Sequence, residues 1–138
     1  MLHDQPLSDA RLRITADIDN SRYSVWLDEC LVNLPLARFT ALLELVRCRL
    51  TRSKGYAALR DFDSGGDKRL LHQTIRRTRR DFDDAIGANA GKALIQHNGA
   101  STYRLAVEPD QIEISPDLME LVPDHISETL ACALLNAV

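Results

Sequence analysis

The sequence predicts an α+β fold in which short strands come first, three helices follow, and a β-hairpin comes after the helices. Apolar and polar residues alternate near the N-terminus, and the apolar spacing becomes helical after Pro35. An Asn-Gly pair then separates two strand-like runs. The chain has 138 residues, 45% of them hydrophobic and 27% charged, which suits one domain with an ordinary core.

The strands are predicted by alternation between turn signals. Residues 12–16 and 23–27 alternate, and residues 30–32 follow an Asp28-Glu29 turn. Asn20-Ser21 is a second turn signal. A strand with one buried face alternates in this way, so we expect a small N-terminal antiparallel sheet.

The first helix is predicted over residues 35–53, where apolar side chains recur at helical spacing. Pro35 suits the first turn of a helix, because the N–H that proline lacks has no partner there. Gly55 is the expected C-cap, since glycine readily takes the left-handed conformation that ends many helices.

A short second helix is expected over residues 56–62 and a long third helix over residues 67–88. The Asp63-Ser64-Gly65-Gly66 break separates them, and Asp67 is placed to cap the third. The third helix has one narrow apolar stripe, and its other faces are polar and basic. The stripe consists of Leu71, Ile75, Thr78, Phe82 and Ile86.

Residues 93–97 and 101–105 are the expected strands of the hairpin around Asn98-Gly99, because both turn residues tolerate a positive φ. We place a domain over residues 1–108 and an acidic, mostly helical extension over residues 109–138. The extension is expected to start with a strand at 111–114, followed by helices that begin at Ser115 and Pro123. Three roles are open for it: packing on its own domain, pairing with a second copy through its last helix, or covering the basic helix and restraining binding.

The charge distribution is uneven although the net charge is only -3. From Arg47 to Arg80 there are eleven Lys/Arg and three Asp/Glu, whereas from Glu108 to Val138 there are seven Asp/Glu and no Lys/Arg. A basic segment within an acidic chain indicates a surface for an anionic partner such as nucleic acid.

A basic third helix directly before a hairpin is the arrangement of a winged helix-turn-helix, in which that helix enters the major groove of double-stranded DNA. Arginine can bind the guanine edge and glutamine the adenine edge, while lysine and arginine neutralise phosphates. We assign base edges to Arg69, His72, Gln73 and Arg76, and phosphates to Arg77, Arg79 and Arg80. Lys68 lies on the same polar surface, and the hairpin contributes His97, Asn98 and Arg104 as candidate backbone contacts.

Three segments carry a family resemblance. Residues 32–43 match an apolar pattern at the start of a helix, residues 71–82 match a recognition-helix pattern, and Tyr103-Arg104-Leu105 after Gln96-His97-Asn98-Gly99 matches a wing. Together, residues 12–105 resemble the DNA-binding effector domain of OmpR/PhoB-type response regulators. The resemblance implies a winged-helix fold and duplex DNA as the partner.

The sequence departs from that family at several positions. Pro35 stands where the family usually has threonine, Arg38 where it has glutamate, and Thr78 where it has leucine. The wing is longer, and the chain carries no phosphoacceptor receiver domain. The resemblance therefore does not imply control by phosphorylation.

Other classes of function have less support in the sequence. A basic helical face can be only a solvated face, with Arg79 and Arg80 paired to Asp83 and Asp84. The alternative function is a winged-helix protein–protein interaction module whose arginines meet an acidic partner. A third reading is an enzyme, but no catalytic constellation is present, so we expect no enzyme and no cofactor.

Metal binding, disulfides and membrane insertion are not expected either. The four histidines have no ligand spacing, and Cys30, Cys48 and Cys132 form no C-x-x-C pair, so the cysteines are expected to be small buried residues. No apolar run approaches the roughly 20 residues of a membrane span. The N-terminus lacks the order of a signal peptide, and we expect a cytoplasmic protein.

Overall fold

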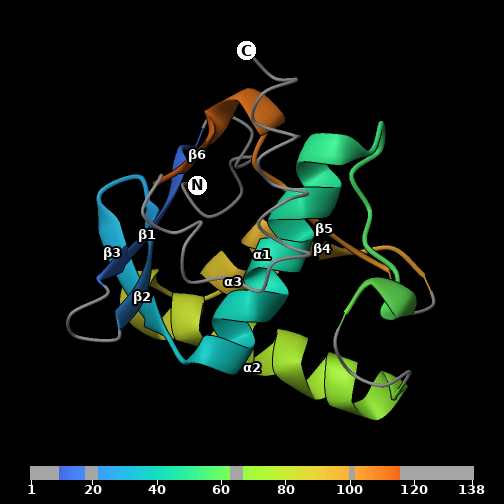
Figure 1. Cartoon of the computed structure of the whole chain (residues 1–138). Helices are drawn as coiled ribbons and strands as arrows, with labels where there is room; N and C mark the ends of the chain where they lie inside the picture. The colour runs from blue at the N-terminus through green and yellow to red at the C-terminus, as the bar shows by residue number, and fades with distance from the viewer. Residues whose placement is uncertain (1–9, 18–21, 63–66, 100–101, 116–138) are drawn as a thin grey trace.

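The first three strands form an antiparallel sheet, as predicted. They are β1 (Leu12–Asp17), β2 (Arg22–Leu27) and β3 (Cys30–Leu34), and β1 and β3 pair with opposite edges of β2. The structure is a computed structural model that describes residues 10–17, 22–62, 67–99 and 102–115 (Figure 1). Over these residues the fold is mixed α+β, with the sheet on one side of the central helix.

A fourth strand, β6 (Ile112–Ile114), follows the one-turn 3-10 helix η4 (Pro109–Gln111) and completes this sheet. It pairs in parallel with β1, so that Leu12 lies opposite Ile112, and the strand order is β3-β2-β1-β6. The expected strand at 111–114 is thus present as part of the N-terminal sheet. The helices expected after Ser115, and with them the proposed pairing of two copies, lie outside the described residues.

Helix α1 (Leu36–Thr51) is the centre of the fold. It contacts β2, β5 and α2, and every side chain from 41 to 46 is buried. The boundaries differ slightly from those predicted. Pro35 is the N-cap, and the helix ends at Arg52, whose N–H donates to the carbonyl of Cys48. Gly55 has a φ of 74° but lies in the following turn, so it does not cap the helix as expected.

The expected second helix over 56–62 is wrong: only one turn of 3-10 helix, η3 (Leu59–Asp61), forms there. The reason is a long-range pairing. The N–H of Ala57 donates to the carbonyl of Tyr103 at 2.8 Å, and the N–H of Tyr103 donates to the carbonyl of Ala57 at 3.0 Å. These backbone groups are therefore used in an antiparallel bridge and cannot serve a helix.

The η3 turn is fixed by the carboxylate of Asp61. This carboxylate accepts hydrogen bonds from Arg52 at 2.6 and 2.8 Å and from the N–H of Ala58 at 2.7 Å, and Arg47 lies 3.3 Å away. The Arg52 guanidinium is the main reason why the pKa of Asp61 is held at about 2. The network joins the end of α1 to the segment that pairs with the hairpin.

Helix α2 (Lys68–Ile86) begins where predicted. The side chain of Asp67 accepts from the N–H groups of Arg69 and Leu70, which is an N-cap. The helix contacts α1, β3 and α3, and Nη1 of Arg38 in α1 donates to both carboxylate oxygens of Asp81 and so ties α2 to α1. The predicted stripe faces the core: Leu71, Ile75, Thr78 and Phe82 are buried, and Ile86 is partly buried.

A short helix, α3 (Ala90–Leu94), replaces the start of the expected strand 93–97. Its cause is close packing on α2. The N–H of Gly91 donates to the carboxylate of Asp83 at 2.8 Å, and a Cβ at Gly91 would overlap the backbone of Arg79. The hairpin strands are consequently short, β4 (Ile95–His97) and β5 (Tyr103–Leu105), with His97 opposite Tyr103.

The connection in this hairpin is longer than the predicted Asn-Gly turn. The N–H of Asn98 donates to the carbonyl of Thr102 at 2.9 Å. Gly99 has a φ of 66°, whereas Asn98 does not take a positive φ. Of the three cysteines expected to be buried, Cys48 is buried and Cys30 is exposed, while Cys132 lies outside the described residues. None of the helices among the described residues is long and apolar enough to cross a membrane.

Candidate nucleic-acid interface

The solvent-facing side of α2 carries the predicted basic residues. Gln73 and Arg79 are half-buried, and the others are exposed. Within the described part of the chain, Asp83 accepts from Gly91, and the alternative in which Arg79 and Arg80 form salt bridges with Asp83 and Asp84 is not seen, although the charge of Asp83 still acts on Arg79. The side chains on this side that are exposed are Lys68, Arg69, His72, Arg76, Arg77 and Arg80.

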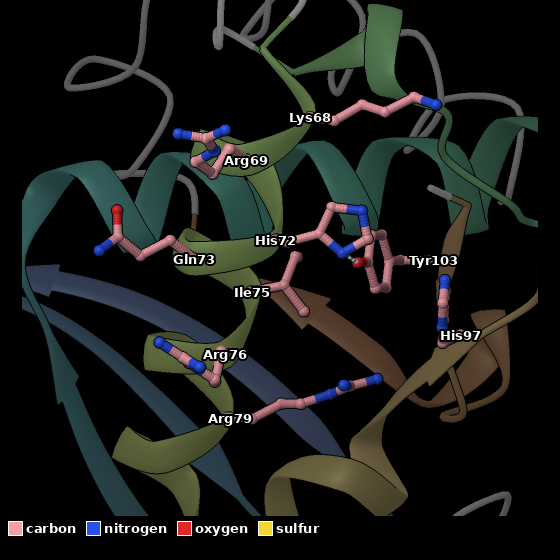
Figure 2. A pocket seen from close by; sticks show the side chains of 9 residues that line it. All are labelled: Lys68, Arg69, His72, Gln73, Ile75, Arg76, Arg79, His97 and Tyr103. Carbon is pink, nitrogen blue, oxygen red and sulfur yellow. Dashed lines mark hydrogen bonds between the residues drawn. The ribbon is translucent and has the colours of Figure 1, made fainter. Parts of the chain in front are cut away.

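An open cleft of about 720 Å³ lies between this face and the hairpin (Figure 2). Arg77, Arg80, Asn98 and Arg104 from the predicted set do not line it. No carboxylate is among its lining residues, so it is a strongly cationic concavity. The residues that line it are Lys68, Arg69, His72, Gln73, Ile75, Arg76, Arg79, His97 and Tyr103.

A ring cluster joins α2 to the hairpin at one end of the cleft. The hydroxyl of Tyr103 lies 2.8 Å from Nδ1 of His72, and the ring of His97 stacks on that of Tyr103 with a centroid distance of 4.8 Å. The rings of His72 and His97 also lie near each other, with centroids 6.1 Å apart, and Figure 2 shows both beside Tyr103. Tyr103 is only 2% exposed, and burial raises the pKa of its phenol, so Tyr103 remains protonated at neutral pH.

Tyr103 is the site residue that the sequence reasoning missed. The wing pattern included it, but only as a structural match. The predicted strands 93–97 and 101–105 gave no signal for its role, because they would place His97 opposite residue 101, whereas the observed register pairs His97 with Tyr103. The sequence could not place His72 next to it, since 31 residues separate the two.

Arg79 lies deeper in the cleft than we expect for a side chain that contacts phosphates from the surface of the helix. Its Nε donates to the carbonyl of Ile95 at 3.2 Å, and Nη2 donates to the same oxygen. The guanidinium carbon lies 5.8 Å from the centre of the Tyr103 ring. Burial lowers the pKa of Arg79, so its charge is less well solvated than that of an exposed arginine.

Arg104 points to the other side of the hairpin. It donates to the side chain of Gln96 at 2.8 and 3.2 Å and to the carbonyl of Lys54 at 3.2 Å, and it stacks over Tyr56. Adjacent residues of a strand point to opposite faces, so Arg104 and Tyr103 cannot both face α2. The tip residue Asn98 is exposed and does not reach the cleft.

Among residues 10–17, 22–62, 67–99 and 102–115, no group of three or more His, Cys, Asp or Glu side chains could hold a metal ion.

Comparison with known proteins adds no information, because no family model, no curated protein and no solved structure matches the chain.

Proposed function

We propose that the protein is a winged-helix DNA-binding regulator of transcription that places α2 in the major groove of duplex DNA. The observation that carries the proposal is the composition of one surface. Arginines on the outer face of α2 have no acidic partner among the described residues, and the hairpin stands beside them. A surface of unpaired cations that can replace the counterions of DNA is what duplex binding requires.

The shape of the site supports the same partner. α2 has 19 residues. A helix of this size is roughly 28 Å long, and the major groove admits one α-helix. The first turns of a recognition helix usually approach the bases, so Arg69, Gln73 and Arg76 are the base-reading candidates. Arg77 and Arg80 lie further along and are candidates for the phosphates.

The proposed winged-helix fold differs from the usual arrangement at the second helix. In this chain a 3-10 turn stands where a helix-turn-helix has its second helix. The pairing of Ala57 with Tyr103 and the Asp61 network hold this turn against the hairpin and the end of α1. Support for α2 thus comes from α1, β3 and α3, so α2 does not depend on a full second helix.

The test is fluorescence anisotropy with a labelled random-sequence duplex of about 20 base pairs, or two helical turns, at low and rising salt. We expect binding that weakens steeply with salt, because bound phosphates release counterions. The double variant Arg76→Ala, Arg80→Ala should bind at least about tenfold more weakly at low salt. The slope of the logarithm of its binding constant against the logarithm of the salt concentration should become shallower by about one for each phosphate that the variant can no longer neutralise.

The matched control is Arg11→Ala, Arg13→Ala, which removes the same charge from the N-terminal sheet. Both residues are exposed, and the control should bind nearly as the parent does. Wild-type binding by the Arg76/Arg80 variant would contradict the assigned face. Absence of duplex binding at micromolar protein and low salt would favour the interaction module instead.

A further inference from the structure

The guanidinium of Arg79 joins α2 to the hairpin. Its Nε and Nη2 donate to the carbonyl of Ile95 in β4, and its carbon lies 5.8 Å from the centre of the Tyr103 ring in β5. Figure 2 shows the Arg79 side chain reaching from α2 towards the hairpin, whereas that of Arg76 points away from it. One side chain of α2 therefore contacts both strands of the hairpin.

This contact is directional, unlike the apolar packing at the base of the hairpin. The side chains of Ile95 and Leu105 belong to the hydrophobic core. Apolar burial is non-directional, so it sets the depth of the hairpin in the fold better than its angle. A planar guanidinium carries a rigid fork of donors, so its bonds to one carbonyl also fix an orientation.

The charge of Arg79 has partners within the protein. Burial lowers the pKa of this guanidinium, while the charge of Asp83 acts in the opposite direction. An arginine whose donors already bind a carbonyl gains less from a phosphate than a fully hydrated one. Arg77 and Arg80 differ, because both are exposed and neither has a side-chain hydrogen bond or salt bridge with a described residue.

We propose that Arg79 is a positioning residue: it holds the hairpin at a fixed angle to α2, so that both elements can contact one duplex, and it does not itself bind a phosphate. The inference rests on the proposed function and revises the role that the sequence predicts for this arginine. His97, which lines the cleft, lies two residues after Ile95 in β4. A hold on the carbonyl of Ile95 therefore also limits where His97 lies relative to α2.

A hairpin that is fixed before binding does not have to be ordered when DNA arrives. The free-energy cost of ordering it is then absent from the binding free energy. Loss of the Arg79 contact should weaken binding through the hairpin, while the contacts of α2 with DNA remain. Loss of a phosphate contact would act differently, because it makes the affinity less dependent on salt.

The test compares Arg79→Met and Arg79→Lys with the matched control Arg80→Met. Methionine removes the charge, whereas lysine keeps the charge but lacks the planar fork. If Arg79 positions the hairpin, its two variants should behave alike. If Arg79 bound a phosphate, lysine would retain most of the binding. Melting followed by circular dichroism confirms that each variant is folded at the assay temperature.

NMR of the backbone amides measures the position and order of the hairpin directly. Without DNA, we expect the heteronuclear NOE of His97 and Asn98 to fall in both Arg79 variants and to be unchanged in Arg80→Met. A duplex of about 20 base pairs, or two helical turns, is then added. The amides of α2 should shift in every variant, whereas the shifts of His97 and Asn98 should be lost in the Arg79 variants only.

Anisotropy with the same duplex gives the affinities. Both Arg79 variants should bind about fivefold more weakly than the wild type at low salt, in keeping with the cost of ordering a few side chains. The logarithm of their binding constant should fall with the logarithm of the salt concentration as steeply as in the wild type. For Arg80→Met this slope should be shallower by about one.

The outcomes separate the two proposals. Wild-type order of the hairpin in both Arg79 variants would overturn the inference and leave DNA binding intact. Wild-type binding by Arg79→Lys, together with a shallower salt slope for Arg79→Met, would do the same and make Arg79 a phosphate contact. Absence of duplex binding by the wild type would overturn the proposed function and with it the DNA role of Arg79, and the relaxation of the free protein would still decide whether Arg79 holds the hairpin.

Discussion

The hydroxyl of Tyr103 and Nδ1 of His72 lie 2.8 Å apart, so a hydrogen bond between two side chains joins the hairpin to the exposed face of α2, in addition to the bonds from Arg79 to the carbonyl of Ile95. Tyr103 is almost fully buried, while His72 is exposed. The bond thus connects an interior residue to the proposed interface.

Replacing Tyr103 by phenylalanine tests the strength of that connection. The ring remains and the hydroxyl is removed, so we expect destabilisation of about 1 kcal/mol, the usual net value of one hydrogen bond. Urea unfolding of both proteins measures it. An exposed His72 can bind water instead, and a loss above about 3 kcal/mol would mean that the hydroxyl has a larger structural role.

The Asp61 network predicts a pH-dependent stability. The pKa of Asp61 lies at about 2 in the folded protein, below its ordinary value of 3.8. A lowered pKa stabilises the fold above the unfolded value, and this stabilisation is lost as the pH falls from about 4 to about 2. Asp61→Asn should therefore cost about 2 kcal/mol at neutral pH. The difference from wild type should shrink in acid, as measured by urea unfolding at several pH values, and a constant difference would contradict this account.

Gly91→Ala tests the close approach of α3 and α2. Alanine is the better helix former by about 1 kcal/mol, so propensity alone predicts stabilisation. The new Cβ would overlap the carbonyl oxygen and Cα of Arg79, and the two helices would have to separate. We expect net destabilisation of about 1–3 kcal/mol in thermal or urea unfolding.

The control for that variant is Gly99→Ala at the hairpin tip. Apart from its chain neighbours, no atom of the described residues lies within 4 Å of its added Cβ, and the φ of 66° opposes the change. Its cost should be about 1–2 kcal/mol from backbone strain alone. Stabilisation by Gly91→Ala would show that α3 can move away from α2 freely.

The two described cysteines should react very differently with a thiol reagent. Cys30 is exposed, whereas burial raises the pKa of Cys48 to about 11. Since the thiolate is the reactive form, Cys48 should be modified only when the protein unfolds. In a Cys132→Ser background at about pH 8, we expect one thiol to react fast and one to react slowly. The absorbance of the released reagent group measures both rates. Two fast thiols would mean that α1 opens locally.

Local patterns were sufficient for much of the fold. The alternating residues of β1 and β2 and the stripe of α2 face the core as predicted, because burial of one face dictates a period of two or of 3.6. Asp67 caps α2 for an equally local reason, since its side chain needs only the N–H groups two and three residues ahead. These elements depend little on distant parts of the chain.

The errors have long-range causes. Tyr56, Leu59 and Phe62 are spaced as in a helix, yet Ala57 pairs with Tyr103, far along the sequence. The start of the predicted strand at Ala93 became helical because α3 packs against Arg79 of α2. Neither of these interactions leaves a local signal.

The candidate site divides in the same way. The basic residues of α2 share a helix, so helical spacing alone could group them. The ring cluster could not be predicted, because it combines His72 of α2 with two residues of the hairpin that become neighbours only after folding. The different environments of Arg79 and Arg104 could not be predicted for a related reason. Each depends on the side of the hairpin on which the guanidinium lies after folding.

The parallel pairing of β6 with β1 sets an order of events during synthesis. Leu12 and Ile112 are partners although roughly one hundred residues separate them, a loop that must close before the two strands can pair. While the ribosome makes the intervening chain, the outer edge of β1 has open N–H and C=O groups that a neighbouring nascent chain can bind. The sheet is closed on that side only when the last described strand has emerged.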